Sequence, residues 1–254
     1  MICRTCGKDN QPNHRFCQEC GSPLPVEGSP RPRAASETSR ANVRGRLVLV
    51  RPDGSDGGSH PLNEGANLLG RGSGPLFDAD SYLSPIHVRI EVGSGKNDGR
   101  CIVRDAGSLN GVFLKISEEE LLHDGAHFRL GQELLRFETL RPARLLEDGT
   151  EVMGSPNPGY WGRISIVIGR HHDGSSFPLF GEAVVLGRER GDILFSEDGY
   201  VSGTHARVSN RNGQAFLQDL ASSNGTFLKI QGERVITSGT YLLLGQQLFR
   251  VTLG

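Results

Sequence analysis

The sequence predicts an all-β protein, with two antiparallel β-sandwiches preceded by a small metal-binding unit. Short apolar runs with polar alternation follow one another from Arg46 onward, separated by Gly, Asp, Asn and Ser, which is typical of sandwiches. These runs occur twice in the same order, and four of the five cysteines lie within the first twenty residues. Helical periodicity is absent, and we expect at most one helical turn, at 118–122.

The first element is a cysteine unit expected at 1–24. Two Cys-x-x-Cys turns bring four thiolates together, which suits a closed tetrahedral zinc site. We therefore expect one structural zinc ion, with two local disulfides or a rubredoxin-like iron as alternatives. His14 is a further candidate ligand that four thiolates leave unnecessary. The expected ligands are Cys3, Cys6, Cys17 and Cys20.

The remaining chain divides by composition and repetition. Residues 25–44 are rich in Pro, Ser and Arg, and we expect them to form a flexible linker. Two domains are expected at 45–140 and 162–254, joined by a second linker at 141–161, because a repeat of about 95 residues has the length of a whole domain. Cys101 lies in an apolar run and is expected to be a buried hydrophobic residue.

Three polar residue types recur at matching places in the two copies. An Arg guanidinium can chelate a dianionic phosphate, and a Ser hydroxyl can donate a further hydrogen bond to it. An Asn amide can hold the main chain of an extended peptide. The pattern thus favours binding of an anion on a peptide over bond cleavage. With offsets of 117, 118 and 114 residues, the pairs are Arg71 and Arg188, Ser84 and Ser202, and Asn110 and Asn224.

The order Gly-Arg, Ser-x-x-His and Ser-x-Asn-Gly resembles the forkhead-associated (FHA) domain, and the second copy, with SSNGTF at 222–227, is the better match. The resemblance implies an eleven-stranded β-sandwich that binds phosphothreonine peptides through loops at one end. It implies that the Arg pair takes the phosphate, the Ser pair donates to it and the Asn pair holds the peptide. Residues implied to support these loops are His87, His205 and Thr226.

The first copy departs from the family pattern. Val112 stands where the second copy has Thr226, and Pro85 follows Ser84 without a backbone N–H. The first domain is therefore expected either to bind phosphopeptides or to act as a docking or dimerisation module. Thr38, beside an acidic residue in the first linker, is a candidate regulatory phosphosite whose phosphate would occupy the protein's own domain.

The expected function is a non-enzymatic adaptor in serine/threonine kinase signalling. Its expected partners are phosphothreonine proteins, such as a kinase or its substrate. No catalytic carboxylate pair, nucleophile elbow or open metal site is recognisable, and the glycines at 70–74 lack the lysine of a nucleotide loop.

A nucleic-acid-associated regulator is the alternative, with the zinc ribbon and Arg-rich linker contacting phosphates and the two domains serving as docking modules. The short cysteine unit is similar to zinc ribbons of bacterial regulatory proteins, which implies contact with protein or nucleic acid. The net charge of -1 supplies no general attraction to nucleic acid. Neither a signal peptide nor an apolar run of membrane-spanning length is recognisable, so we expect a cytoplasmic protein.

Overall fold

The computed structural model describes residues 2, 8–11, 42–93, 100–141, 146–170 and 172–254. The chain divides into two compact units, Met1–Ala41 and Asn42–Gly254, and all the named strands lie in the second. Within the first unit, Ile2 and Asp9 form an isolated antiparallel bridge. The described residues contain strands and turns but no helix, which confirms the all-β class.

Within the described part of the chain, the first repeat forms nine strands and the second forms ten. Those of the first are β1 (Val43–Val50), β2 (Asp56–Asn63), β3 (Gly65–Leu69), β4 (Val88–Val92), β5 (Arg100–Asp105), β6 (Val112–Lys115), β7 (Glu120–Leu122), β8 (His127–Leu130) and β9 (Glu133–Thr139). Those of the second are β10 (Gly162–Gly169), β11 (His172–Leu179), β12 (Ala183–Gly187), β13 (Ile193–Leu194), β14 (Ala206–Arg211), β15 (Gln214–Asp219), β16 (Thr226–Lys229), β17 (Glu233–Thr237), β18 (Tyr241–Leu244) and β19 (Gln247–Leu253).

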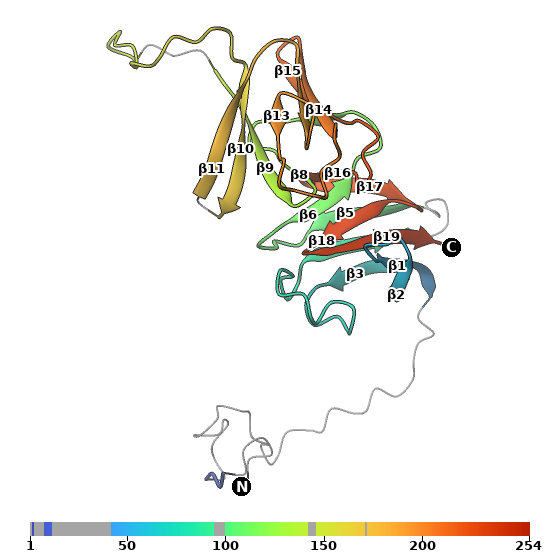
Figure 1. Ribbon diagram of the computed structural model, residues 1–254. Helices are drawn as coiled ribbons and strands as arrows, with labels where there is room; N and C mark the ends of the chain where they lie inside the picture. The colour runs from blue at the N-terminus through green and yellow to red at the C-terminus, as the bar shows by residue number, and fades with distance from the viewer. Residues whose placement is uncertain (1, 3–7, 12–41, 94–99, 142–145, 171) are drawn as a thin grey trace. The chain divides into compact units, whose positions relative to one another are not determined.

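These strands form two β-sandwiches that share one long sheet (Figure 1). The order of the long sheet is β11-β10-β9-β8-β16-β6-β18-β19-β1-β2. A sheet of order β17-β5-β4-β3 packs on one half of it, and a sheet of order β13-β12-β14-β15-β7 packs on the other half. The first sandwich therefore comprises β1–β6 with β17–β19, and the second comprises β7–β16.

The two repeats exchange their last three strands. The C-terminal strand β19 pairs antiparallel with β1, and β9 of the first repeat pairs antiparallel with β10 of the second. Figure 1 shows the red β19 beside the blue β1, and the green β9 beside the yellow β10. The repeats at 45–140 and 162–254 thus each contribute strands to both sandwiches.

The exchange occurs where β6 and β16 pair with each other. These strands are antiparallel, with Leu114 opposite Leu228. Immediately after β6, Ile116 is buried in the core of the second sandwich, and immediately after β16, Ile230 is buried in the core of the first. A small apolar cluster of Phe113, Phe227 and Leu243 packs at this junction.

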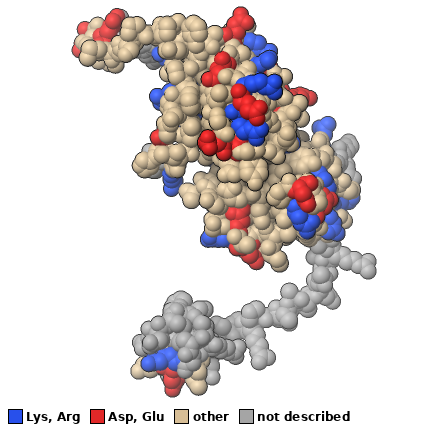
Figure 2. Space-filling model, viewed as in Figure 1, with Lys and Arg blue, Asp and Glu red and all other residues tan. Residues whose placement is uncertain are grey.

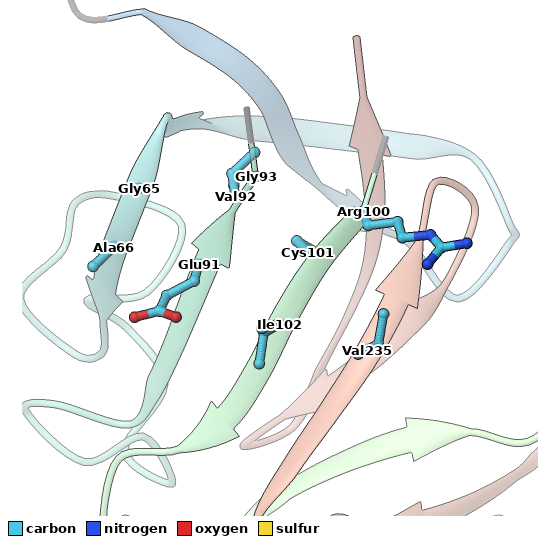
Figure 3. Close-up of a pocket in the computed structure, with 9 residues that line it drawn as sticks. All are labelled: Gly65, Ala66, Glu91, Val92, Gly93, Arg100, Cys101, Ile102 and Val235. Atoms are coloured by element: carbon cyan, nitrogen blue, oxygen red, sulfur yellow. The ribbon is translucent and has the colours of Figure 1, made fainter. Parts of the chain in front are cut away.

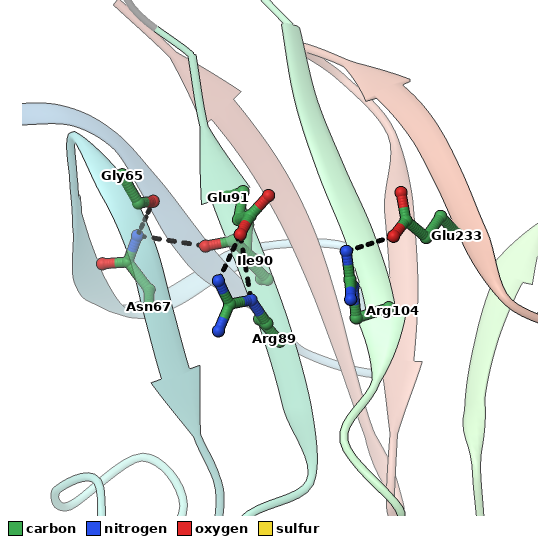
Figure 4. A network of polar contacts seen from close by, with 7 residues as sticks. All are labelled: Gly65, Asn67, Arg89, Ile90, Glu91, Arg104 and Glu233. Carbon is green, nitrogen blue, oxygen red and sulfur yellow. Dashed lines mark hydrogen bonds and ion pairs between the residues drawn. The ribbon is translucent and has the colours of Figure 1, made fainter.

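Buried apolar and outward-facing polar side chains alternate along the strands, and the buried ones form the two cores. On β4, Val88, Ile90 and Val92 are buried, while Arg89 and Glu91 face outward and pair with each other (Figure 4). A second ion pair, between Arg104 of β5 and Glu233 of β17, links strands from different repeats. The largest fully buried side chains of the two cores include Phe77, Phe128, Phe137 and Phe249.

The strands differ from expectation in two places. Among the described residues, the sandwiches have nine and ten strands instead of the eleven implied by the resemblance. The short β13 has no counterpart in the first sandwich, where Pro75 takes the place of Ile193 and supplies no backbone donor. The helical turn expected at 118–122 is wrong, because Glu120–Leu122 forms β7 and pairs with β15 of the other repeat.

Candidate functional site

The candidate residues of the first sandwich meet at one end of its strands. The end of β3 lies opposite the start of β4, with Leu69 paired to Val88, and Val88 is paired in turn with Asp105 at the end of β5. The loop between β3 and β4 carries Arg71 near its start and Ser84 near its end, and the loop after β5 carries Asn110. Antiparallel pairing therefore brings the two ends of one loop and a second loop to one edge.

Hydrogen bonds close the β3–β4 loop on itself and fix it to the loop after β5. The Arg71 amide donates to the Ser84 carbonyl at 3.0 Å, and the Leu109 amide donates to Ser84 Oγ at 3.0 Å. Asn110 Nδ2 donates to the Tyr82 carbonyl at 2.8 Å. Because Ser84 Oγ accepts from the Leu109 amide, its own O–H remains available to donate. Asn110 keeps its Oδ1 as an acceptor and one further N–H as a donor.

The second sandwich repeats this arrangement. The Arg188 amide donates to the Ser202 carbonyl at 2.9 Å, and the Ser223 amide donates to Ser202 Oγ at 3.0 Å. Asn224 Nδ2 donates to the Tyr200 carbonyl at 2.8 Å. Two stretches of chain with different side chains thus form the same hydrogen-bonded frame.

A buried histidine lies beneath each frame. His87 Nδ1 accepts from the Ser84 amide at 3.1 Å, and its Nε2 lies 3.0 Å from the Gly111 carbonyl. His205 makes the equivalent contacts with Ser202 and Gly225 at 3.0 and 3.2 Å. Both rings are fully buried, and burial lowers the pKa of each. A neutral ring that accepts at Nδ1 and donates at Nε2 satisfies both contacts, which leaves neither nitrogen for catalysis.

The Asn-Gly pairs also require glycine. Gly111 and Gly225 have φ angles of 88° and 85°, and a Cβ on either would lie 2.2 Å from the Cε atom of a lysine. These lysines, Lys229 and Lys115, are the last residues of the opposite strands of the β6–β16 pair, and the atoms concerned are the far ends of flexible side chains that can shift. The left-handed φ therefore favours glycine after the site asparagine.

A threonine–aspartate network supports only the second frame. Thr226 is fully buried, and its hydroxyl donates to Asp219 Oδ2 at 2.7 Å. The same carboxylate accepts from both the amide and the hydroxyl of Ser222. In the first sandwich Val112 replaces Thr226, and the structure shows Asp105 accepting from the Ser108 amide. The two frames thus differ in their interior support.

The two arginines differ in their counter-ions. The Arg188 guanidinium forms an ion pair with Glu189, with Nη2 2.7 Å from Oε1. At the corresponding place after Arg71 stands Gly72, and no salt bridge to Arg71 occurs among the described residues. The first site therefore presents an unpaired guanidinium, whereas the second presents one that is already paired.

Sequence reasoning missed two buried aspartates that join the repeats. Asp80 accepts from the Tyr82 amide through Oδ1 and from the Gln246 amide through Oδ2. Asp198 likewise accepts from the amides of Tyr200 and Gln132. Each carboxylate thereby ties a binding loop to a turn of the other repeat. The recurring Asp-x-Tyr spacing and the recurring Gly-Gln turn were the available signals.

Several predicted residues lie elsewhere. Thr38 and the four expected zinc ligands, Cys3, Cys6, Cys17 and Cys20, fall outside the described residues. Cys101 is 1% exposed, which confirms the expectation of burial, and desolvation raises the pKa of its thiol to about 12.

A groove on the first sandwich lies apart from the candidate site (Figure 3). Its lining includes Gly65 at the start of β3, Val92 at the end of β4 and Arg100 at the start of β5. Since the candidate residues lie at the opposite ends of these strands, the groove is not part of their site.

The molecular surface mixes charges of both signs. On the face seen in Figure 2, basic and acidic side chains are interleaved over the described part of the chain. Ion pairs among the described residues include Arg136 with Asp173 and Arg211 with Glu119. No helix of the described residues has the length and apolar character needed to cross a membrane.

Comparison with protein families gives two matches. The FHA domain family matches residues 68–131 and 166–247, which together make up more than half of the chain. The zinc-ribbon domain family matches residues 2–24. The matched segments contain the candidate Arg, Ser and Asn residues of both copies and all four N-terminal cysteines.

Among curated proteins, the chain is similar to the FHA domain-containing protein FhaB of Mycolicibacterium smegmatis and to that of Mycobacterium tuberculosis. Identity is 38% over 55 residues in each case, covering 22% of this chain and 36% of each relative. The chain thus spans about a third of the length of these relatives.

Three solved structures resemble parts of the chain. EmbR of Mycobacterium tuberculosis, solved with a low-affinity phosphopeptide, is 24% identical with a TM-score of 0.20, covering 32% of this chain and 22% of its own. An FHA domain of Chlamydia trachomatis is 26% identical with a TM-score of 0.20, covering 31% and 85%. A structure from work on phosphothreonine-dependent FHA interactions is 24% identical with a TM-score of 0.22, covering 34% and 91%.

Proposed function

Because the chain belongs to the FHA domain family, we propose that it is a non-enzymatic adaptor that binds phosphothreonine peptides through both sandwiches. The observation that supports this most is the duplicated frame of Arg, Ser and Asn at the strand ends. Each frame presents a guanidinium, a hydroxyl with its proton free and an amide with an unused acceptor. These groups match a phosphate dianion carried on an extended peptide.

Each residue has a distinct role in the proposal. Arg71 and Arg188 chelate the phosphate, because a guanidinium presents a planar fork of donors. The hydroxyls of Ser84 and Ser202 donate to the same phosphate. Asn110 and Asn224 hold the peptide main chain, and the buried histidines and Thr226 keep the loops in place.

The partners in this proposal are phosphothreonine proteins of serine/threonine kinase signalling, either a kinase or its substrate. A cytoplasmic location is part of this proposal, and it agrees with the assignment of the clustered cysteines to a metal, since a reducing compartment disfavours disulfides. The formal net charge of -1 supplies no general attraction to nucleic acid, which favours the adaptor over the nucleic-acid alternative.

Calorimetry of the full chain against a phosphothreonine peptide library tests the proposal. We expect Arg71→Ala and Arg188→Ala each to remove one binding event, and the double variant to lose about a hundredfold in affinity. Arg207→Ala, on an exposed position of β14, is the matched control and should bind as the parent does. Equal binding of unphosphorylated peptides, or full binding by the double variant, would contradict the proposal.

We further propose that the N-terminal ribbon holds one structural zinc ion. Four thiolates form a closed donor set for zinc, and the Ile2–Asp9 bridge joins the residues that flank the first Cys-x-x-Cys turn in sequence. Metal analysis of the purified chain should give about one zinc per molecule, and Cys6→Ser with Cys17→Ser should remove it. Iron in place of zinc, or zinc retained by the double variant, would contradict the assignment.

A further inference from the structure

The two candidate sites share one backbone frame but surround it with different side chains. Ile86 of the first site corresponds to Thr204 of the second, and Leu109 corresponds to Ser223. The hydrogen bonds made by the backbone at these places are equal in length, since the Leu109 and Ser223 amides each lie 3.0 Å from the site serine Oγ. The two sites can therefore be compared within one chain, because their backbone hydrogen bonds match while their neighbouring side chains differ.

The first site is bordered by exposed apolar side chains. Tyr82, Ile86 and Leu109, which we call the apolar rim, are 52%, 53% and 63% exposed. Each lies within two residues of a candidate binding residue: Tyr82 and Ile86 flank Ser84, and Leu109 precedes Asn110. Single exposed hydrophobic residues are ordinary, but three in loops that are hydrogen-bonded together around one anion site are not explained by folding.

The second site is polar and charged at the same places. It keeps Tyr200 at the position of Tyr82, but Thr204 and Ser223 replace the two aliphatic residues. It adds the Arg188–Glu189 ion pair and the neighbouring Arg190, where the first site has Gly72 and Ser73. The residues that border the site are therefore partly aliphatic at the first site, and at the corresponding places of the second they carry hydroxyl or charged groups.

On the premise that both sites bind phosphothreonine, we propose that they select different peptides. The first site takes phosphothreonine flanked by large apolar residues, whose side chains pack on the apolar rim. The second gains nothing from apolar flanks. The occupant follows from the continuity of the rim with the phosphate frame, because the Leu109 amide donates to Ser84 Oγ, the Tyr82 carbonyl accepts from Asn110, and Ile86 lies two residues after Ser84. Apolar packing there removes aliphatic surface of both partners from water.

Calorimetry with matched peptides tests this selectivity on the full chain. The peptides share one phosphothreonine and differ only in flanking leucines or serines. Arg188→Ala reports on the first site and Arg71→Ala on the second. With the first site alone, we expect the leucine peptide to bind about tenfold tighter than the serine peptide. With the second site alone, the ratio should be about one.

Exchanging the rim residues provides the decisive comparison. Ile86→Thr with Leu109→Ser, in the Arg188→Ala background, should lower the leucine preference to about one. Thr204→Ile with Ser223→Leu, in the Arg71→Ala background, should create a preference, a gain that misfolding cannot imitate. Ile168→Thr, at a 71% exposed position on β10, is the control for loss of an exposed aliphatic residue and should change neither ratio.

The outcomes separate this inference from the proposed function. Equal leucine-to-serine ratios at the two sites, or ratios that do not respond to the rim exchange, overturn the inference while phosphopeptide binding stands. Absence of phosphopeptide binding in the parent protein and in both single-site variants rejects the proposed function, and this inference with it.

Discussion

Glu189 forms an ion pair with Arg188, the residue whose guanidinium is proposed to bind phosphate. Its carboxylate accepts from both Nε and Nη2 of Arg188, at 3.2 and 2.7 Å, and this contact lowers the pKa of Glu189. A phosphate must displace this carboxylate or share the guanidinium with it. At the first site the equivalent position, Gly72, offers no such competition.

We therefore predict that Glu189→Gly strengthens peptide binding at the second site. Measured in the Arg71→Ala background, the affinity should rise about threefold, the scale of an exposed ion pair, and the gain should shrink as salt is added. Gly72→Glu, measured in the Arg188→Ala background, should weaken the first site by a similar factor. An unchanged or weaker second site in Glu189→Gly would show that the carboxylate supports the guanidinium instead of competing with phosphate.

The buried histidines predict how stability depends on pH. Burial lowers the pKa of His87 and His205 from the usual 6.5, against the opposing effect of Asp80 and Asp105 around the first ring and Asp198 and Asp219 around the second. Lys229 adds to the lowering at His87. At these two histidines the unfolded chain therefore binds more protons just below pH 6.5, so their contribution to the free energy of unfolding is constant well above that value and falls as the pH drops below it.

Urea unfolding at several pH values between about 7.5 and 5.5 measures this dependence. The double variant His87→Asn, His205→Asn should be less stable at neutral pH, because each ring makes two loop contacts, but it should lose less stability on acidification. His123→Asn, at an exposed position, is the control and should leave the slope unchanged. An equally steep loss of stability in the double variant would assign the acid sensitivity to other groups.

At the scale of the elements, the alternation of apolar and polar residues in the sequence indicates which face of each strand is buried. It does not indicate which strand lies beside it. The segments DGAHFRLGQELLRFE and SGTYLLLGQQLFRVT have almost the same apolar pattern. Either could therefore close either sandwich. Local periodicity supports both arrangements equally, so the exchange of strands could not be predicted from sequence.

More of the candidate site than of the strand order could be predicted from the sequence. Arg, Ser and Asn recur in both copies, and their chemistry suggests a ligand without knowledge of neighbours. The recurring Asp-x-Tyr and Gly-Gln patterns mark Asp80 and Asp198 as a repeated feature, but they do not indicate the contact, because the partners, the amides of Gln246 and Gln132, belong to the other repeat. The strand at 120–122 was missed for the same reason, since its partner β15 lies far along the chain.

The cross-repeat aspartates give a prediction at this scale. Asp198→Ala removes the acceptor of two amides, which should lower the free energy of unfolding by about 1–3 kcal/mol and weaken peptide binding at the second site. Asp198→Asn keeps an acceptor and should have a smaller effect. Hydrogen exchange should show faster exchange at Tyr200 and also at Gln132. Faster exchange confined to the loop around Tyr200 would count against the contact between the repeats.

At the scale of the whole molecule, the exchange makes the two sandwiches one interleaved body. The first sandwich is closed by β1–β19 and β5–β17 pairs, and the second by β9–β10 and β7–β15 pairs, each joining strands of different repeats. The segment 141–161 therefore connects neighbouring strands of one sandwich instead of separating two domains. The binding loops themselves come each from a single repeat, so both frames are complete on one chain.

Cutting the chain between the repeats distinguishes this arrangement from a simple tandem. Met153 is 97% exposed in the connection between β9 and β10, so a protease site inserted after it should be cleaved without disturbing either core. The two fragments should elute together in native buffer and separate only in denaturant, because seven strand pairings between the described parts of the repeats, and both cores, hold them together. Phosphopeptide binding should also survive the cut. In an unexchanged tandem each fragment would hold a complete sandwich, so separation of the fragments without denaturant would exclude the exchanged fold.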